Sequence, residues 1–408
     1  MPQEECKEKI LSEEYRDFMM RDTGALGENF PLENGCRIPL KYGFELLYID
    51  QSEDRKKPLG DYPYTMVPKC YTTLDMAAIQ QAGIAAVQNL TGLELSGEGV
   101  LVGIIDTGIN YLDPIFRNLD GSTRIRRIWD QEEQSGTAPR EIGYGSEYTR
   151  EQINLAIQSE NPKETVPSFD TDGHGTFVAS VACGGANPEN LFIGAAPEAE
   201  MVIVKLKEAK EYLREYYFVD CDARCYQEND LVAAVFYLQK VQEELKRPLV
   251  ICLAVGTSFG GHGGYSILSE YLQNVAASEG IGIVTGSGNE ADKRHHYLGI
   301  LEQENNQPVE INVGNNTRGF VMELWTELPN LLALSIESPT GQTIGPVSLR
   351  RGIGEYVFVF EQTRVIFNYR VLVETTGAQL AFFQFDRPGS GIWKIIPETL
   401  ELGNGIFH

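Results

Sequence analysis

Three polar residues have side chains suited to acid–base chemistry and stand beside glycines. Asp106 ends an apolar run, His174 lies between two glycines, and Asn289 follows the triplet Gly-Ser-Gly at 286–288. An aspartate bound to Nδ1 of a histidine fixes the tautomer and makes the ring a general base. An amide can donate to a developing oxyanion. Together, the three residues predict a site for general-base catalysis.

Each of these residues also has a simpler structural interpretation, which the sequence leaves open. Asp106 could cap the following element or stabilise a turn. His174 could be a hydrogen-bonded core residue, and Asn289 could occupy the turn position that Asn often takes after Gly. The choice between catalysis and local structure depends on whether one framework places all three side chains.

The segments around these residues predict a parallel sheet covered by helices on both faces. Short continuous apolar runs are typical of strands buried on both faces, and four occur, at residues 99–106, 200–206, 248–255 and 280–286. Amphipathic helical patterns lie at 229–246 and 266–280. This alternation indicates an α/β fold, in which ligands bind at the carboxyl ends of the strands.

The two ends of the chain have different patterns. Residues 1–65 are polar and broken by Gly and Pro, with a helix-like stretch at 10–21 and a strand-like run at 42–50. This favours a small N-terminal domain or a propeptide. Beyond residue 300, short strand-like runs alternate with turn signals, which is typical of an antiparallel β-sandwich. We therefore expect three regions, at 1–65, 66–300 and 301–408.

Four segments resemble, in order, motifs of the subtilase family of serine proteases. They are VLVGIIDTGIN around Asp106, DGHGTFVASVACGG around His174, VICLAVGTSFGGHGG at 250–264 and GIVTGSGNEA around Asn289. The resemblance implies a subtilisin-like parallel sheet flanked by helices. It also implies that Asp106 orients His174, that His174 is the general base, and that Asn289 stabilises the oxyanion.

The same resemblance implies a set of substrate-binding residues. Three of them would hold the substrate backbone as an added strand, and three more lie before the oxyanion residue. The set is Ala254, Val255, Gly256, Gly286, Ser287 and Gly288.

Phrases such as INYLDPIFRN and RIRRIWDQ resemble the Csp-type subtilases of spore-forming anaerobes. In that group a jelly-roll sandwich is inserted after the oxyanion residue. The resemblance implies that residues 1–65 are an inhibitory prodomain, that residues 66–300 form the catalytic domain, and that 301–408 belong to the insert. Maturation would cut near GDYPYTMVPKCY, at 60–71.

The serine motif of the family, GTS-x-A-x-P, is missing from the 408 residues. GTS occurs once, at Gly256–Ser258, before Asn289 and in the segment that resembles the cleft wall, so Ser258 is not the expected nucleophile. The catalytic domain and the sandwich are therefore expected to be incomplete, with the nucleophile beyond residue 408. As printed, the chain is expected to be inactive.

Charge and composition limit the partners. The net charge of −24 argues against nucleic acid, because phosphates would be repelled. No run of about 18 apolar residues predicts a membrane span. The expected partners are a polypeptide substrate and the chain's own N-terminal prodomain.

The N-terminus has no apolar signal-peptide region, which favours a cytoplasmic or spore-associated protein. The seven cysteines are expected to be free thiols in a reducing compartment. Adjacent histidines on a strand point to opposite faces, so His295 and His296 do not predict a metal site. A structural calcium ion has no supporting motif, and no metal or other cofactor is expected.

Two other functions remain open at this stage. The first is a pseudoprotease that binds a protein partner or a signal during spore germination. The second is a carbohydrate- or protein-binding module built around the sandwich, which would leave the four subtilase-like motifs unexplained.

Overall fold

The computed structural model describes most of the chain. The described residues are 3–21, 35–54, 57–73, 84–88, 95–187, 192–291, 293–301, 307–347, 352–373, 376–401 and 403–408. Within these ranges, no helix is both long and apolar enough to cross a membrane.

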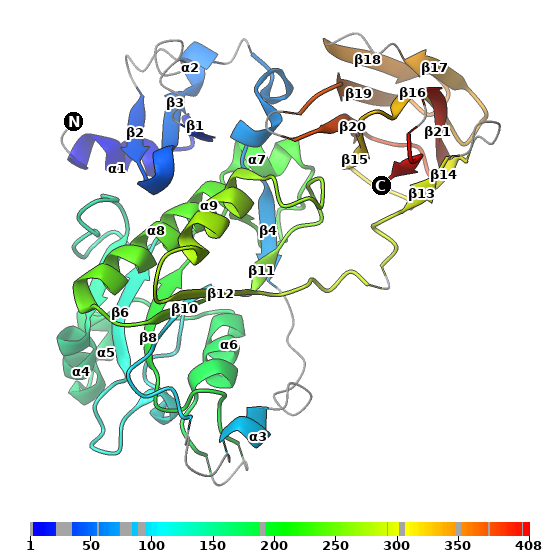
Figure 1. Cartoon of the computed structure of the whole chain (residues 1–408). Coiled ribbons are helices and arrows are strands. Elements are labelled where there is room, and N and C mark those ends of the chain that lie inside the picture. Colours follow the sequence, from blue (N-terminus) through cyan, green and yellow to red (C-terminus); the bar gives the residue numbers. More distant parts are fainter. Residues whose placement is uncertain are drawn as a thin grey trace.

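A six-stranded sheet forms the centre of the largest region (Figure 1). Its strands, in spatial order, are β12 (Ile281–Thr285), β10 (Leu249–Leu253), β5 (Leu101–Asp106), β8 (Glu200–Lys205), β6 (Ile125–Asp130) and β7 (Ser146–Thr149). All neighbours are parallel except β6 and β7. The predicted α/β framework is therefore present.

Helices cover both faces of this sheet. Alternate residues of β5 point to opposite sides: Leu101 and Ile105 join the core under one set of helices, and Val102 and Ile104 join the other core. The first set is α8 (Glu228–Leu245) and α9 (Ile267–Ala276); the second includes α6 (His174–Cys183) and α4 (Arg150–Gln158). A Cβ at Gly103 would lie 2.6 Å from Leu238 of α8, so this glycine allows the close packing.

The run at 280–286 was predicted to be a strand buried on both faces, and this burial is wrong for β12. The strand matches that run, but the predicted burial is absent: Val284 is 57% exposed. The physical reason is position, because β12 is an edge strand paired only with β10 within the sheet. An apolar run alone does not distinguish a central strand from an edge strand.

The N-terminal residues form a small separate sheet packed beside α8 (Figure 1). Its strands, in spatial order, are β1 (Tyr15–Arg21), β3 (Phe44–Asp50) and β2 (Cys36–Pro39). The helices α1 (Gln3–Leu11) and α2 (Gln51–Asp54) belong to the same N-terminal region. The predicted helix at 10–21 is wrong, because most of it is β1. Phe18, Met19 and Met20 are all buried there, and pairing with β3 satisfies the backbone.

Cys6 of α1 and Cys36 of β2 form a disulfide. The expectation that all seven cysteines are free thiols is therefore wrong. The two residues are 30 positions apart in sequence, and only the packing of α1 against β2 brings them together.

Residues beyond 298 form two antiparallel sheets around a shared apolar core. One sheet contains β13 (Gly299–Ile300), β22 (Ile406–Phe407), β15 (Gly319–Glu327), β20 (Ala378–Asp386), β19 (Thr363–Arg370) and β18 (Gly352–Phe358). The other contains β14 (Val309–Val313), β21 (Gly391–Glu401), β16 (Leu331–Glu337) and β17 (Thr343–Val347). The antiparallel strands predicted for this part of the chain are present.

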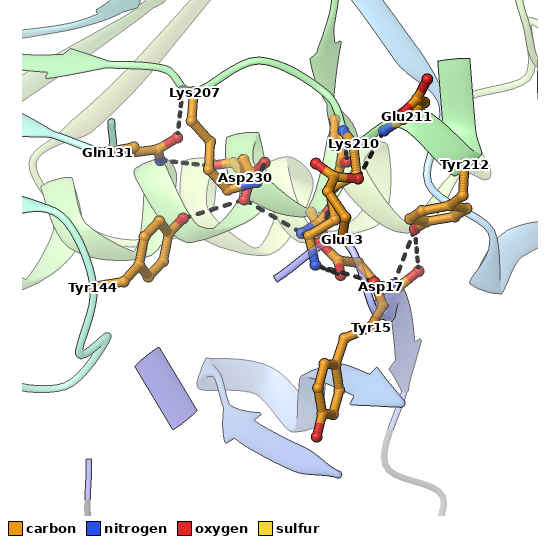
Figure 2. Close-up of polar contacts among 12 residues, drawn as sticks. Glu13, Tyr15, Asp17, Gln131, Tyr144, Lys207, Lys210, Glu211, Tyr212 and Asp230 are labelled. Atoms are coloured by element: carbon orange, nitrogen blue, oxygen red, sulfur yellow. Dashed lines mark hydrogen bonds and ion pairs between the residues drawn. The ribbon is translucent and has the colours of Figure 1, made fainter. Parts of the chain in front are cut away.

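A buried ion pair joins the N-terminal sheet to the large region (Figure 2). Lys210 Nζ donates to Asp17 Oδ1 over 2.6 Å, and both side chains are almost fully buried. Gln227 and Asn229 donate to Asp17 Oδ2 over 2.9 and 3.3 Å. Burial lowers the pKa of Lys210, although the charge of Asp17 acts in the opposite direction. The carboxylate of Asp17 therefore compensates a cation that burial disfavours.

We expect Asp17→Asn to destabilise the protein by about 3–5 kcal/mol, because it leaves the buried Lys210 without its counter-charge. Urea unfolding followed by fluorescence measures the change. Asp61→Asn, at an exposed position, is the control and should shift the midpoint little. Equal midpoints for the two variants would contradict the assigned role of Asp17.

Candidate active site

Asp106 and His174 lie in direct contact. Asp106 is the last residue of β5 and is fully buried, and His174 is the first residue of α6. The distance from His174 Nδ1 to Asp106 Oδ1 is 2.7 Å. With the Nδ1 proton donated to the carboxylate, Nε2 is left as the basic nitrogen. This pair has the geometry of an oriented general base.

Two glycines allow the start of α6 to approach β5. Gly173 has φ +95°, in the left-handed region that favours glycine. A Cβ at Gly175 would lie 2.2 Å from the carbonyl oxygen of Gly108. A side chain at Gly175 would therefore push the helix away from the strand end and separate His174 from Asp106.

Asp170 fixes the turn that leads into α6. Its Oδ1 accepts hydrogen bonds from Thr107 Oγ1 (3.0 Å) and Gly173 N (2.9 Å), and its Oδ2 accepts from Thr176 N (2.9 Å) and Thr176 Oγ1 (2.6 Å). Thr107 Oγ1 in turn accepts from Gly175 N over 2.8 Å. This carboxylate therefore holds both the loop after β5 and the first turn of α6.

Asp170 was not among the site residues predicted from the sequence. Its position directly before the Asp-Gly-His triplet, in the segment DTDGHGT, was the available signal. Burial raises the pKa of this carboxyl, but the hydrogen bonds from Thr176, Gly173 and Thr107 outweigh it and lower the pKa overall.

The segment expected to hold a substrate backbone is paired with another part of the same chain. β11 (Val255–Gly256) follows β10, whose Leu253 pairs with Ile105 of β5, so Ala254 stands level with Asp106. β11 pairs antiparallel with β4 (Cys70–Thr73), in the register Val255 opposite Thr73. Figure 1 shows β4, in blue, beside β11.

β4 is the middle strand of a three-stranded sheet. On its other side it pairs antiparallel with β9 (Tyr226–Gln227), in the register Tyr71 opposite Tyr226. Burial and the charge of Glu208 raise the pKa of Tyr226, and the charge of Asp106 adds to this effect. β4, an extended strand from the first 73 residues, thus lies between β9 and β11.

The side chains around β4 add further contacts. Tyr71 Oη donates to Glu228 Oε1 over 3.3 Å, and Lys69 N donates to Glu228 Oε2 over 3.3 Å. Burial raises the pKa of Glu228, opposed mainly by the nearby charge of Lys69. The strand is therefore held by side-chain contacts as well as by its backbone.

The glycine-rich segment after β12 lies at the surface. Gly286 N donates to the carbonyl oxygen of Leu253 over 3.3 Å, so the segment starts beside the end of β10. Gly286, Ser287, Gly288 and Asn289 are all exposed, and Gly288 has φ +95°. The described contacts bring Asp106 and His174 together and do not include Asn289.

Ser258, the serine of the GTS segment, is exposed in the loop after β11. In the part of the chain that the structure describes, no group of three or more His, Cys, Asp or Glu side chains is arranged to hold a metal ion.

Comparisons with known proteins agree with these motifs. Residues 97–317, more than half of the chain, match the model of the Subtilase family. Two proteins of Arabidopsis thaliana, subtilisin-like proteases SBT2.2 and SBT2.3, are each 33% identical to this chain over 102 and 101 residues. Each match covers 23% of this chain and 12% of the relative, so the chain spans only a small part of these relatives.

A solved structure of the CspB protease of Clostridium perfringens is also similar. It has a TM-score of 0.68 and 28% sequence identity, over 79% of this chain and 65% of that one. The chain thus spans slightly less than two thirds of this structural relative.

We expect Asp170→Asn to reduce stability by about 1–3 kcal/mol at pH 7, because hydrogen bonds to a charged group are lost. The pKa of Asp170 is below its ordinary value of 3.8 in the folded protein. Its stabilisation is therefore fully present above that value and is lost as pH falls through the folded-state pKa. Urea midpoints of wild type and variant should differ at pH 7, and the difference should shrink as the pH falls below 3.8; a difference independent of pH would contradict this role.

Proposed function

Because the chain belongs to the subtilase family, we propose that its site is that of a serine endopeptidase, which cleaves extended polypeptides by acyl transfer. The observation that carries this proposal is the 2.7 Å contact between His174 Nδ1 and the buried Asp106 carboxylate. This contact is what a general base for a serine hydroxyl requires.

In the proposed mechanism, Asp106 holds the imidazole in one tautomer. His174 Nε2 removes the proton of a serine hydroxyl as that oxygen attacks the peptide carbonyl, and then passes the proton to the departing amine. Asp106 stabilises the imidazolium that forms between the two steps. Asn289 is proposed to donate its amide to the oxyanion, a contribution of about 2.7–4 kcal/mol in such sites.

The nucleophile is proposed to stand outside the 408 residues. The only GTS segment belongs to β11 and the loop after it, where its Gly256 pairs with β4. The printed chain is therefore proposed to bind an extended strand without cleaving it. The likeness to a CspB protease supports assignment to the Csp-type group that the sequence resembles, with a role in spore germination or formation and a cytoplasmic or spore-associated location.

Strand β4 is proposed to bind as a substrate would. It is extended, lies antiparallel to β11 and β9, and ends where Ala254 stands level with Asp106. Residues 1–73 would then be the inhibitory prodomain, with its last strand in the cleft. This proposal moves the boundary from residue 65 to the end of β4, and residues 301–408 remain the proposed insert.

The segment before β4 supports this boundary. Tyr62, Met66, Val67 and Lys69 are buried, and Arg370 of β19 donates to the carbonyl oxygen of Gly60 over 2.6 Å. The segment at 60–71, where the sequence resemblance suggested a cut, is thus packed against the rest of the protein. A cut directly after β4 would leave these contacts of residues 60–69 intact.

Fluorophosphonate labelling tests the proposed activity, since the reagent reacts with an activated serine. We expect the protein made from its own gene to be labelled, and the 408-residue chain to remain unlabelled. In the gene product, His174→Ala or Asp106→Asn should slow labelling by about 10⁴-fold, whereas His295→Ala, an exposed histidine, should not. An unlabelled gene product would refute the peptidase proposal. Labelling of the 408-residue chain that depends on His174 would place the nucleophile within it.

N-terminal sequencing of the processed gene product tests the boundary. We expect the new N-terminus at Leu74 or Asp75, because β4 ends at Thr73. Leu74→Pro should block processing, since proline on either side of the cleaved bond restricts the backbone. Leu74→Ala is the matched control and should still be processed. A new N-terminus between residues 60 and 71 would contradict the proposal.

A further inference from the structure

Two buried thiols lie where the N-terminal segment meets the rest of the chain. Cys70 is the first residue of β4, and Cys225 directly precedes β9; both are free thiols in this structure. The pairing places Cys70 opposite Gln227. Because side chains alternate along a strand, Cys225 shares a face with Gln227 and stands diagonally across from Cys70.

This diagonal position on neighbouring strands makes the two buried thiols neighbours. The neighbouring Cys225 thiol, together with burial, raises the pKa of Cys70. The neighbouring Cys70 thiol lowers the pKa of Cys225, helped by Arg214, whose Nη1 lies 3.4 Å from Cys225 Sγ. Cys225 is therefore the member of the pair that forms a thiolate more readily, and a thiolate is the attacking species in disulfide exchange.

Arg214 is held firmly in this position. Its Nη2 donates to three backbone carbonyl oxygens of the loop before β9, and its Nη1 lies 3.2 Å from Glu208 Oε2. The three carbonyl groups are those of Asp220 (2.7 Å), Cys221 (3.0 Å) and Ala223 (2.6 Å). The positive charge beside Cys225 is thus a fixed feature of the loop.

We propose that Cys70 and Cys225 form a reversible disulfide that fastens β4 between β9 and β11. The oxidant is a small-molecule disulfide such as oxidised glutathione. The Cys225 thiolate attacks one sulfur of the oxidant, which releases one small thiol and leaves a mixed disulfide. Cys70 then loses its proton and attacks Cys225 Sγ, which releases the second small thiol. Two protein thiols are oxidised and one small disulfide is reduced to two thiols.

The proposed effect of this bond, retention of the N-terminal fragment, rests on the proposed role of residues 1–73. Formation of the bond does not depend on that role. The Cys6–Cys36 disulfide joins α1 to β2, so it links only elements of the N-terminal region. A Cys70–Cys225 bond would instead join β4 to the other side of the proposed cleavage site. After a cut behind β4, the N-terminal fragment would stay covalently attached until the bond is reduced.

The test uses the 408-residue chain, equilibrated in buffers of reduced and oxidised glutathione long enough for local opening to expose buried thiols. Free thiols are then alkylated in denaturant, and the disulfide-linked peptides are identified by mass spectrometry. We expect a Cys70–Cys225 linked peptide that appears in a single two-electron step as the buffer becomes more oxidising. This measurement uses only the wild-type protein, so it does not depend on whether a cysteine variant folds.

Variants make the assignment specific. Cys225→Ser should abolish the linked peptide and leave Cys70 alkylated, whereas Cys221→Ser, an exposed cysteine four residues away, should leave the link intact. The proposal is overturned if Cys70 and Cys225 are both alkylated in buffers that keep Cys6–Cys36 oxidised, or if Cys225 links to Cys221 instead. Alkylation needs no peptidase activity, so failed fluorophosphonate labelling would leave this result unaffected.

Discussion

The contact between Asp106 and His174 constrains how the strands, loops and helices around it must pack. A fully buried carboxylate at the end of a central strand must meet an imidazole at the start of a helix. That requires Gly175, because any side chain there would collide with the loop after β5. It also requires Asp170, whose hydrogen bonds hold that loop and the first turn of α6 as one unit. The parallel sheet supplies the rigid edge on which this arrangement depends.

The N-terminal residues are bound to this framework by different kinds of interaction. Charge pairing acts at Asp17 and Lys210, where neither partner reaches water. Backbone pairing acts at β4, the middle strand between β9 and β11. Apolar packing acts in a core that includes Phe18 of β1, Leu213 of α7 (Glu211–Tyr216) and Trp325 of β15, so one cluster joins the N-terminal sheet, the large region and the antiparallel sheets. Separation of the N-terminal segment would disturb all three.

The local sequence pattern predicted the central strands of the large sheet correctly. It failed for segments whose structure depends on which distant strand they pair with. The apolar runs before Asp106 and at 200–206 became β5 and β8 because each is buried on both faces. The equally apolar run at 280–286 became an exposed edge strand, and the helix-like stretch at 10–21 became β1. In both cases burial and backbone pairing came from segments distant in sequence, which no local window contains.

The sequence by itself indicated the family and predicted the contact between Asp106 and His174. The Asp, His and Asn motifs, in their order along the chain and with their neighbouring glycines, were enough for both, because motif order and residue type can be read directly from the sequence. Only the tertiary structure decided what lies beside that pair. It placed β4 along Val255 and Gly256, fixed the turn before α6 through Asp170, joined Cys6 to Cys36, and paired β4 with β9 so that Cys70 lies diagonally across from Cys225. Each is a contact between residues far apart in the chain or a fine point of loop geometry, and such contacts depend on how complete elements pack.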